Sequence, residues 1–186
     1  MPSAVDSVFE IAFWFSDRAL NDNEYLQPIK LQYLMFLAQS YFAVAYEGKR
    51  LVPAIFVAEV VGPIEPSIYQ TFTRGRPSLD VPINLNDDVR SFVDSIWRRF
   101  GHHSADYLAK LCRRNPAYKA ALKRGRRAEI DLAEMRDSFV ASTETPAVDS
   151  VVKPKVMRSH TGRAVEVKAA EEPVDWDLAN MPLGPV

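Results

Sequence analysis

Hydrophobic residues in the first 140 positions recur every three to four residues, the spacing that places them on one face of an α-helix. The first run, residues 3–20, begins at Ser3, which forms a capping-box pattern with Asp6 three positions later. Other residues suited to a helix start are Pro28, Pro66, Asn86, Ser104, Pro116 and Asp131. The pattern therefore predicts helices over about residues 3–20, 28–46, 66–72, 87–100, 104–111, 116–122 and 131–139.

The run from residue 28 to residue 46 is hydrophobic on two faces. Leu31, Leu34, Met35, Ala38, Tyr41, Phe42 and Ala45 form one stripe, and Tyr33, Phe36 and Leu37 form a second. A helix that is apolar on most sides lies in a protein interior, so we expect this helix to be central. Residues 54–61 are rich in Val, Ile and Phe between Pro53 and Gly62, a pattern that predicts a short strand.

Helical periodicity disappears after residue 140. Residues 141–186 contain five prolines, one tryptophan and no phenylalanine or tyrosine. Such a composition offers too little apolar surface to offset the entropy of ordering a chain. We therefore expect one mainly α domain (class α+β) over residues 3–140, with a small β element, followed by a flexible, disordered tail over residues 141–186.

Composition narrows the classes of function without naming one. The formal net charge is −1, so no global charge favours nucleic acid or an anionic membrane. Cys112 is the sole cysteine, which excludes an intramolecular disulfide and fits a reducing compartment. The N-terminal residues lack the basic and apolar regions of a signal peptide, and no apolar run reaches membrane-spanning length. These features predict a cytoplasmic protein without membrane contact.

Residues with reactive side chains are few and do not form a catalytic pattern. His102 and His103 are adjacent, so on a helix their side chains would diverge, and a zinc site needs spaced ligands. Cys112 precedes two arginines, which could lower a thiol pKa, but a lone cysteine on an apolar helix face usually belongs to the core. We therefore expect no metal, no cofactor and no enzymatic activity.

The strongest charge feature is the basic segment, residues 113–127. It contains seven basic residues and no acidic one: Arg113, Arg114, Lys119, Lys123, Arg124, Arg126 and Arg127. Three interpretations remain open: a solvated surface, a docking surface for an acidic protein, or a nucleic-acid contact. Nucleic acid is the least favoured of the three because no recognition-helix pattern accompanies the charges.

A second candidate contact region is the stretch Gly62-Pro63-Ile64-Glu65-Pro66-Ser67-Ile68-Tyr69. A structural explanation is that glycine permits a bend and the prolines fix the backbone. A functional explanation places this stiff turn at the edge of a groove, with Tyr69 as an aromatic anchor for a partner. We expect Tyr33 and Tyr41 to be exposed aromatic residues of the central helix and to belong to the same partner surface.

Several of these segments together resemble the Panacea domain of bacterial and phage toxin–antitoxin systems. The resemblance rests on Lys30-Leu31-Gln32-Tyr33-Leu34, on Gly62-Pro63-Ile64-Glu65-Pro66-Ser67-Ile68-Tyr69 and on Ser104-Ala105-Asp106-Tyr107-Leu108, in that order. It spans about residues 30–139. One departure is local: the family usually has Thr-His and then Pro-Trp where this chain has Leu111-Cys112 and Pro116-Ala117.

The resemblance implies a function in binding. It implies a compact helical domain that acts as an antitoxin for a cognate toxin. Within the family, the chain most resembles members that act as proteolytic adaptors. Such adaptors deliver the toxin to the ClpX unfoldase of ClpXP and so protect DNA replication. We place the contact with ClpX in the tail, at Val151, Val152, Lys153, Lys155 and Val156, where apolar and basic residues alternate. The alternative is a DNA-binding transcriptional regulator that uses the basic segment.

Overall fold

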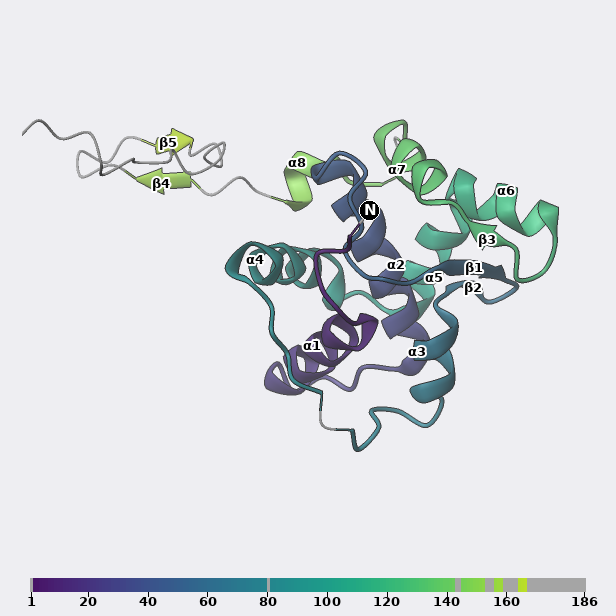
Figure 1. Ribbon diagram of the computed structural model, residues 1–186, viewed down its shortest axis with the longest axis horizontal. Coiled ribbons are helices and arrows are strands. Elements are labelled where there is room, and N and C mark those ends of the chain that lie inside the picture. The colour runs from purple at the N-terminus through teal and green to yellow at the C-terminus, as the bar shows by residue number, and fades with distance from the viewer. Residues whose placement is uncertain (1, 80, 143–144, 153–155, 159–163, 167–186) are drawn as a thin grey trace, which may run out of the picture. The chain divides into compact units, whose positions relative to one another are not determined.

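Figure 1 shows the computed structural model, which describes residues 2–79, 81–142, 145–152, 156–158 and 164–166. The chain divides into two compact units, Met1–Val152 and Lys153–Val186. The second unit contains an antiparallel pair of strands, β4 (Val156–Arg158) and β5 (Ala164–Glu166). The remaining elements belong to the first unit.

The first unit is mostly helical and contains one small sheet, so the expected fold class is confirmed. Its elements are α1 (Val8–Asn21), α2 (Pro28–Ala45), β1 (Phe56–Glu59), β2 (Gly62–Ile64), α3 (Pro66–Thr71), α4 (Asp87–Ile96), a π-helical turn η1 (Trp97–Gly101), α5 (Ala105–Arg114), α6 (Pro116–Arg124), β3 (Glu129–Ile130), α7 (Leu132–Val140) and α8 (Val148–Val151).

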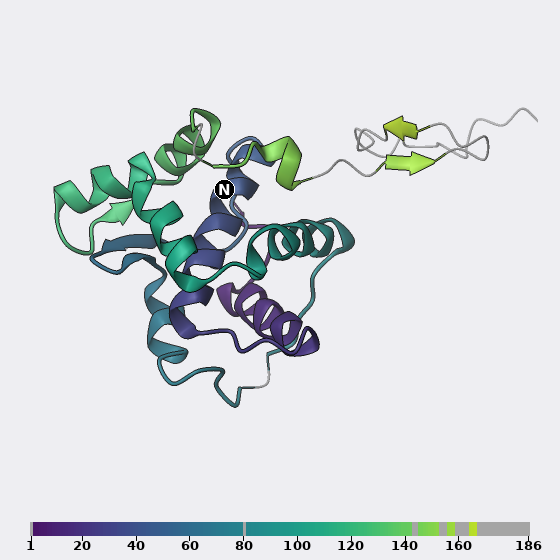
Figure 2. The same cartoon turned by 180° about the vertical axis from the view of Figure 1, so that it is seen from behind.

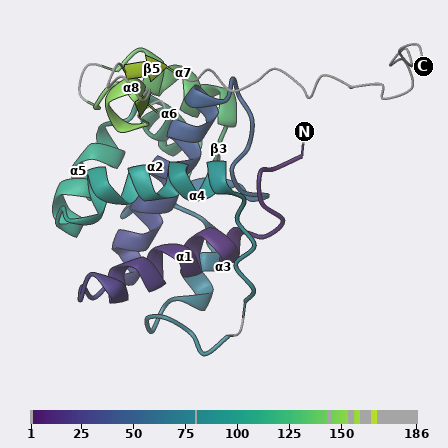
Figure 3. The ribbon, with the colours of Figure 1, turned by 90° about the vertical axis from the view of Figure 1, so that its left-hand side faces the viewer.

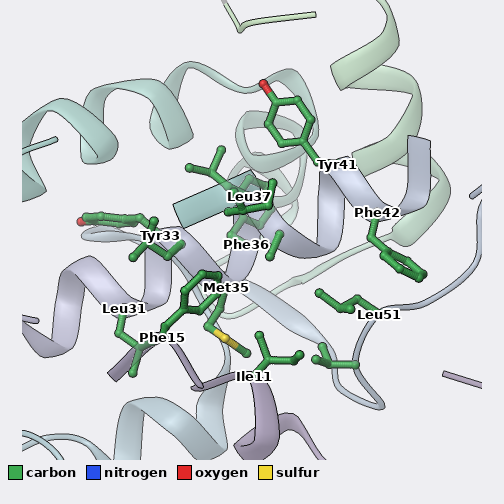
Figure 4. Packing of buried hydrophobic residues seen from close by; sticks show 14 of the residues in the cluster. Ile11, Phe15, Leu31, Tyr33, Met35, Phe36, Leu37, Tyr41, Phe42 and Leu51 are labelled. Carbon is green, nitrogen blue, oxygen red and sulfur yellow. The ribbon is translucent and has the colours of Figure 1, made fainter. Parts of the chain in front are cut away.

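Helix α2 lies at the centre of the first unit, as its hydrophobic pattern predicted. Every residue from Lys30 to Ala43 is buried. The helix contacts α1, α3, α4, α5, α7, α8, η1 and β2. Figure 3 shows α1 and α4 crossing α2, and Figure 4 shows Phe36 within the cluster of apolar side chains that these contacts create.

Helix starts follow their capping residues, with one correction. Asn86, Ser104 and Asp131 each accept hydrogen bonds from backbone amides of the helix that follows. The prediction that Ser3 caps the first helix is wrong. Ser7 is the N-cap, in a capping box with Glu10, while Ser3 instead forms a bridge with Arg50.

The sheet has the order β2-β1-β3, with both pairings antiparallel. The prediction of a stiff turn over residues 62–69 is wrong at residues 62–64, which form strand β2, and the turn itself is Val60-Val61. Strand β3 has no hydrophobic run long enough to predict it. Helix α5 packs against β2 and helix α6 packs against β1, which supports the sheet from one side (Figure 2).

The first unit extends past the predicted boundary at residue 140. Helix α8 packs against α2, and Val151 is buried in the hydrophobic core. The Tyr41 hydroxyl donates a hydrogen bond of 2.7 Å to the carbonyl of Pro146. A one-turn helix is too short to leave a hydrophobic period in the sequence, which explains the error. Among the described helices, none is both long enough and apolar enough to cross a membrane.

Candidate partner-binding groove

Two of the predicted contact residues are not on the surface. Tyr33 and Tyr41 are fully buried in the core, so the prediction that they are exposed is wrong. Each hydroxyl instead donates a hydrogen bond to a backbone carbonyl: Tyr33 to Val61 at 2.6 Å and Tyr41 to Pro146 at 2.7 Å. Burial raises the pKa of both phenols, so both remain protonated donors at neutral pH.

The Gly-Pro-x-x-Pro-x-x-Tyr stretch, residues 62–69, divides between interior and surface. Gly62 and Pro63 are buried in β2, whereas Pro66 and Tyr69 are exposed on α3. Tyr69 is 45% exposed, and the valines of the adjacent turn, Val60 and Val61, are 70% and 42% exposed. Only the second half of this stretch, together with the turn that precedes it, is therefore available to a partner.

These exposed residues border a hollow that we call the hairpin groove. It consists of two adjoining cavities of about 210 and 150 Å³, which share Ile64, Tyr69 and Arg127. The remaining residues that line it are Val57, Glu59, Val60, Val61, Pro66, Gln70 and Arg126. The groove thus joins the β1–β2 hairpin and α3 to the end of the basic segment.

Side chains from three helices hold the hairpin in place. The carbonyl of Val61 accepts hydrogen bonds from the Tyr33 hydroxyl of α2 and from Nε of Arg113 of α5, the latter at 3.2 Å. The Tyr118 hydroxyl of α6 donates to the carbonyl of Glu59 at 2.6 Å. Two of these three donors, Tyr33 and Tyr118, are buried in the core, so the hairpin is held in place without a partner.

A further contact links the central helix to the start of α3. The side-chain oxygen of Gln32 accepts a hydrogen bond of 2.8 Å from the backbone amide of Glu65. The Glu65 carboxylate in turn caps α3 by accepting a bond of 2.6 Å from the amide of Ile68. Gln32 and Tyr33 of α2 therefore hold β2 and the start of α3 in place.

The basic segment does not form one uniform surface. Arg124 pairs with Glu134 at 3.0 Å, and Arg113 is bonded to the hairpin carbonyl described above. Arg126 and Arg127 both pair with Glu59. Arg114, Lys119 and Lys123 are exposed and have no acidic partner in the described part of the chain. Charge counting in sequence missed Glu59, which lies 67 and 68 positions from the two arginines.

Glu59 lies beneath the two arginines. Only 7% of its side chain is exposed, whereas the side chains of Arg126 and Arg127 are 73% and 72% exposed. Hydrogen bonds from Arg127 and then Arg126 hold the pKa of Glu59 below its ordinary value, although desolvation acts in the opposite direction. Because the arginines face water, solvent screens both ion pairs, and their contribution to stability is modest.

We expect Glu59→Gln to lower the free energy of unfolding by about 1 kcal/mol at neutral pH. A carboxyl group whose pKa is lowered by folding stabilises the protein above its unfolded pKa, and this contribution is lost as the pH falls through the folded pKa. The difference between wild type and variant should therefore begin to shrink below pH 4.5, the ordinary pKa of the group. Urea denaturation of both proteins from neutral to acid pH measures this difference. A difference that stays constant down to acid pH would contradict the lowered pKa of Glu59.

The reactive residues lie apart from the groove's opening. Cys112 is completely buried, and burial raises the pKa of its thiol, so the thiol is not ionised at neutral pH. His102 bonds to Glu24 at 2.6 Å, and the ring of His103 stacks on Tyr107. Within the described residues, no three His, Cys, Asp or Glu side chains gather in a way that could hold a metal ion.

Of the residues predicted to contact ClpX, the structure describes Val151, Val152 and Val156. Val151 is buried in the core and Val152 packs against it, so neither is free to dock as the sequence suggested. Val156 begins β4. Lys153 and Lys155 lie outside the described residues.

Comparison with known proteins assigns no role to any of these residues: no protein-family model matches the chain, and no curated protein or solved structure is significantly similar to it.

Proposed function

We propose that this protein is an antitoxin that binds a cognate toxin through the hairpin groove and delivers it to the ClpXP protease. The observation that carries the proposal is the exposed apolar surface of Val60, Val61 and Tyr69 around a groove that also contains two arginines. Aromatic and arginine side chains beside an apolar hollow are the residues that contribute most to protein–protein binding energy.

The two valines strengthen the argument because they occupy a turn. Two-residue connections between antiparallel strands favour Asn, Asp and Gly, which tolerate the backbone of a tight turn. Val60 and Val61 stabilise little where they stand, since much of each side chain faces water. Apolar side chains at such a position contribute binding energy when another protein covers them.

An adaptor also needs a second contact, with the unfoldase, so that binding raises the local concentration of the toxin at the protease. Since Val151 and Val152 belong to the folded unit, our proposal assigns this contact to the part of the chain after Val152. Delivery of this kind uses binding alone and requires no catalytic group.

The expected result is that Val60→Asp combined with Tyr69→Ala weakens toxin binding at least about tenfold, because it removes the apolar anchors of the groove. The candidate toxin is the product of a small neighbouring reading frame that is lethal without this protein. Calorimetry measures binding, and the half-life of the toxin in cells with and without ClpX measures delivery. Val140→Asp is the matched control, since Val140 is equally apolar and 67% exposed on α7.

Unchanged toxin binding by the groove variant would contradict the assignment of the site. A toxin half-life that does not depend on ClpX would contradict delivery and leave an antitoxin that acts by binding alone.

A DNA-binding regulator remains the second candidate. The observation that favours it is the exposed cationic surface of Arg114, Lys119 and Lys123, none of which has an acidic partner within the described residues. Duplex binding that weakens steeply as salt rises, and that Lys119→Gln with Lys123→Gln abolishes, would support this function. The pairing of Arg124, Arg126 and Arg127 with carboxylates argues against it, because these side chains are already partly neutralised.

A further inference from the structure

Arg126 and Arg127 form an arginine pair on a single carboxylate. Nε of Arg126 donates to Oε2 of Glu59 at 2.9 Å, and Nε of Arg127 donates to Oε1 at 2.7 Å. Their Nη1 and Nη2 atoms have no hydrogen-bond acceptor in the described part of the chain. Each guanidinium is thus bonded to Glu59 through one nitrogen, and its side chain is more than 70% exposed.

The backbone around the arginine pair is equally constrained. Arg127 has a φ of 61°, in the left-handed region that residues other than glycine seldom adopt. Its amide donates to the carbonyl of Ala58 at 2.8 Å, and the amide of Ala128 donates to the carbonyl of Gly125 at 3.2 Å. A strained residue persists only where its surroundings hold it, and such residues cluster at binding sites.

Charge and shape in the groove favour different parts of one ligand. Two guanidinium charges face one carboxylate, so the lining keeps one uncompensated positive charge, and Arg113 adds another at the rim. Val57, Ile64 and Tyr69 supply the apolar wall beside Arg127. The cavities, about 210 and 150 Å³, are smaller than a typical site for a cofactor or drug-sized molecule and suit single side chains.

We propose that the hairpin groove recognises an acidic peptide segment of its protein partner, in which an Asp or Glu carboxylate stands next to an apolar side chain. The carboxylate accepts hydrogen bonds from the Nη atoms of the arginine pair, while Glu59 keeps both Nε atoms. The apolar side chain enters the hollow against Ile64 and Tyr69. This inference rests on the proposed function, because it specifies what the toxin presents to the groove.

A phosphate ligand uses only half of this site. Phosphate would satisfy the guanidinium nitrogens, as a carboxylate does, but a nucleic-acid backbone has no side chain to cover Val57 and Ile64. Tyr69 would also remain exposed. An acidic peptide occupies both halves at once, and fixed donors reduce the entropy lost on binding.

The test uses the full chain and fluorescent peptides that are acetylated and amidated, of sequence Gly-Ser-Gly-X-Φ-X-Gly-Ser-Gly. Φ is Leu, Ile or Phe, and X is Asp or Asn. We expect the Asp peptides to bind at least about tenfold more tightly than the Asn peptides, measured by anisotropy. Arg126→Lys with Arg127→Lys keeps the charge but removes the fork of donors, so it should erase most of this preference.

Two controls separate the site from general electrostatics and from unfolding. Lys119→Gln with Lys123→Gln removes two charges from the same basic segment without touching the groove, and it should leave the Asp preference intact. Tyr69→Ala changes an exposed residue, so it should preserve the fold while weakening the Leu, Ile and Phe peptides about tenfold. Equal binding of Asp and Asn peptides, or a preference unaffected by the two arginine-to-lysine changes, would overturn the inference.

A third peptide distinguishes the source of the carboxylate. If a peptide that lacks Asp but ends in a free carboxylate after Φ bound as tightly as the Asp peptides, the assignment to an acidic side chain would be overturned. Failure of the inference and of the proposed function give different results. Toxin capture that survives in the arginine-to-lysine variant overturns only the inference, whereas Asp-selective peptide binding without any toxin partner overturns only the proposed function.

Discussion

Gly62→Ala should lower the free energy of unfolding by about 2–4 kcal/mol. Gly62 has a φ of +134°, a conformation that side-chain-bearing residues rarely adopt. A Cβ atom there would lie 2.7 Å from Cε1 of Tyr33. The Tyr33 ring is buried, and its hydroxyl is bonded to the carbonyl of Val61, so it has no room to move aside. Backbone strain and overpacking therefore add to each other.

Gly125→Ala is the matched control for Gly62→Ala. Gly125 also has a positive φ, +149°, but a Cβ atom at that position would have no neighbour within 4 Å. The control should therefore cost only the backbone strain, of order 1–3 kcal/mol. Urea denaturation of both variants isolates the contact with Tyr33. Equal losses of stability would show that Tyr33 does not restrict residue 62.

The same substitution connects the fold to the groove. A displaced Gly62 would move Val61 and hence the exposed turn, because the pair Glu59–Gly62 closes the hairpin. Tyr33, predicted as a contact residue, instead holds the hairpin from the interior. The sequence pattern predicts that Tyr33 lies on a helix. It does not predict the hydrogen bond to the carbonyl of Val61, which lies 28 residues away.

Elements whose cause is local were predictable from the sequence. The apolar character of α2 on most sides identified it as central. The side chains of Asn86, Ser104 and Asp131 marked helix starts because a cap acts within three residues. The prediction that Ser3 caps the first helix failed because the sequence offers two capping patterns four residues apart, at Ser3 and at Ser7. The pairing of residues 3–5 with residues 50–51 decides between them, and no local pattern contains that contact.

The groove was only half predictable for the same reason. Tyr69 and the arginine pair stood out as an aromatic residue and part of a charge run. Their proximity depends on β1 pairing with both β2 and β3, strands of two to four residues that leave almost no signal. Glu59 was overlooked because a single acid in an apolar strand carries no pattern, although its burial determines where the arginines point.

Phe36→Ala should lower the free energy of unfolding by about 3–5 kcal/mol, the largest loss that we expect from a single core truncation. Phe36 is fully buried on α2, and its ring centroid lies 5.8 Å from that of Phe56 in β1 and 6.2 Å from that of Phe139 in α7. Truncation would remove a contact shared by the central helix, the sheet and the helix that follows it. Figure 4 shows how closely the neighbouring side chains of α2 surround this position.

Two comparisons test whether this loss comes from the cavity. Phe36→Leu keeps most of the apolar volume, so it should cost about 1.5 kcal/mol or less. Tyr69→Ala truncates an aromatic residue at the surface that is 45% exposed, so it should cost about 1 kcal/mol or less. Urea denaturation of the three variants should give this order. If Phe36→Ala cost no more than Tyr69→Ala, Phe36 would not connect the three elements.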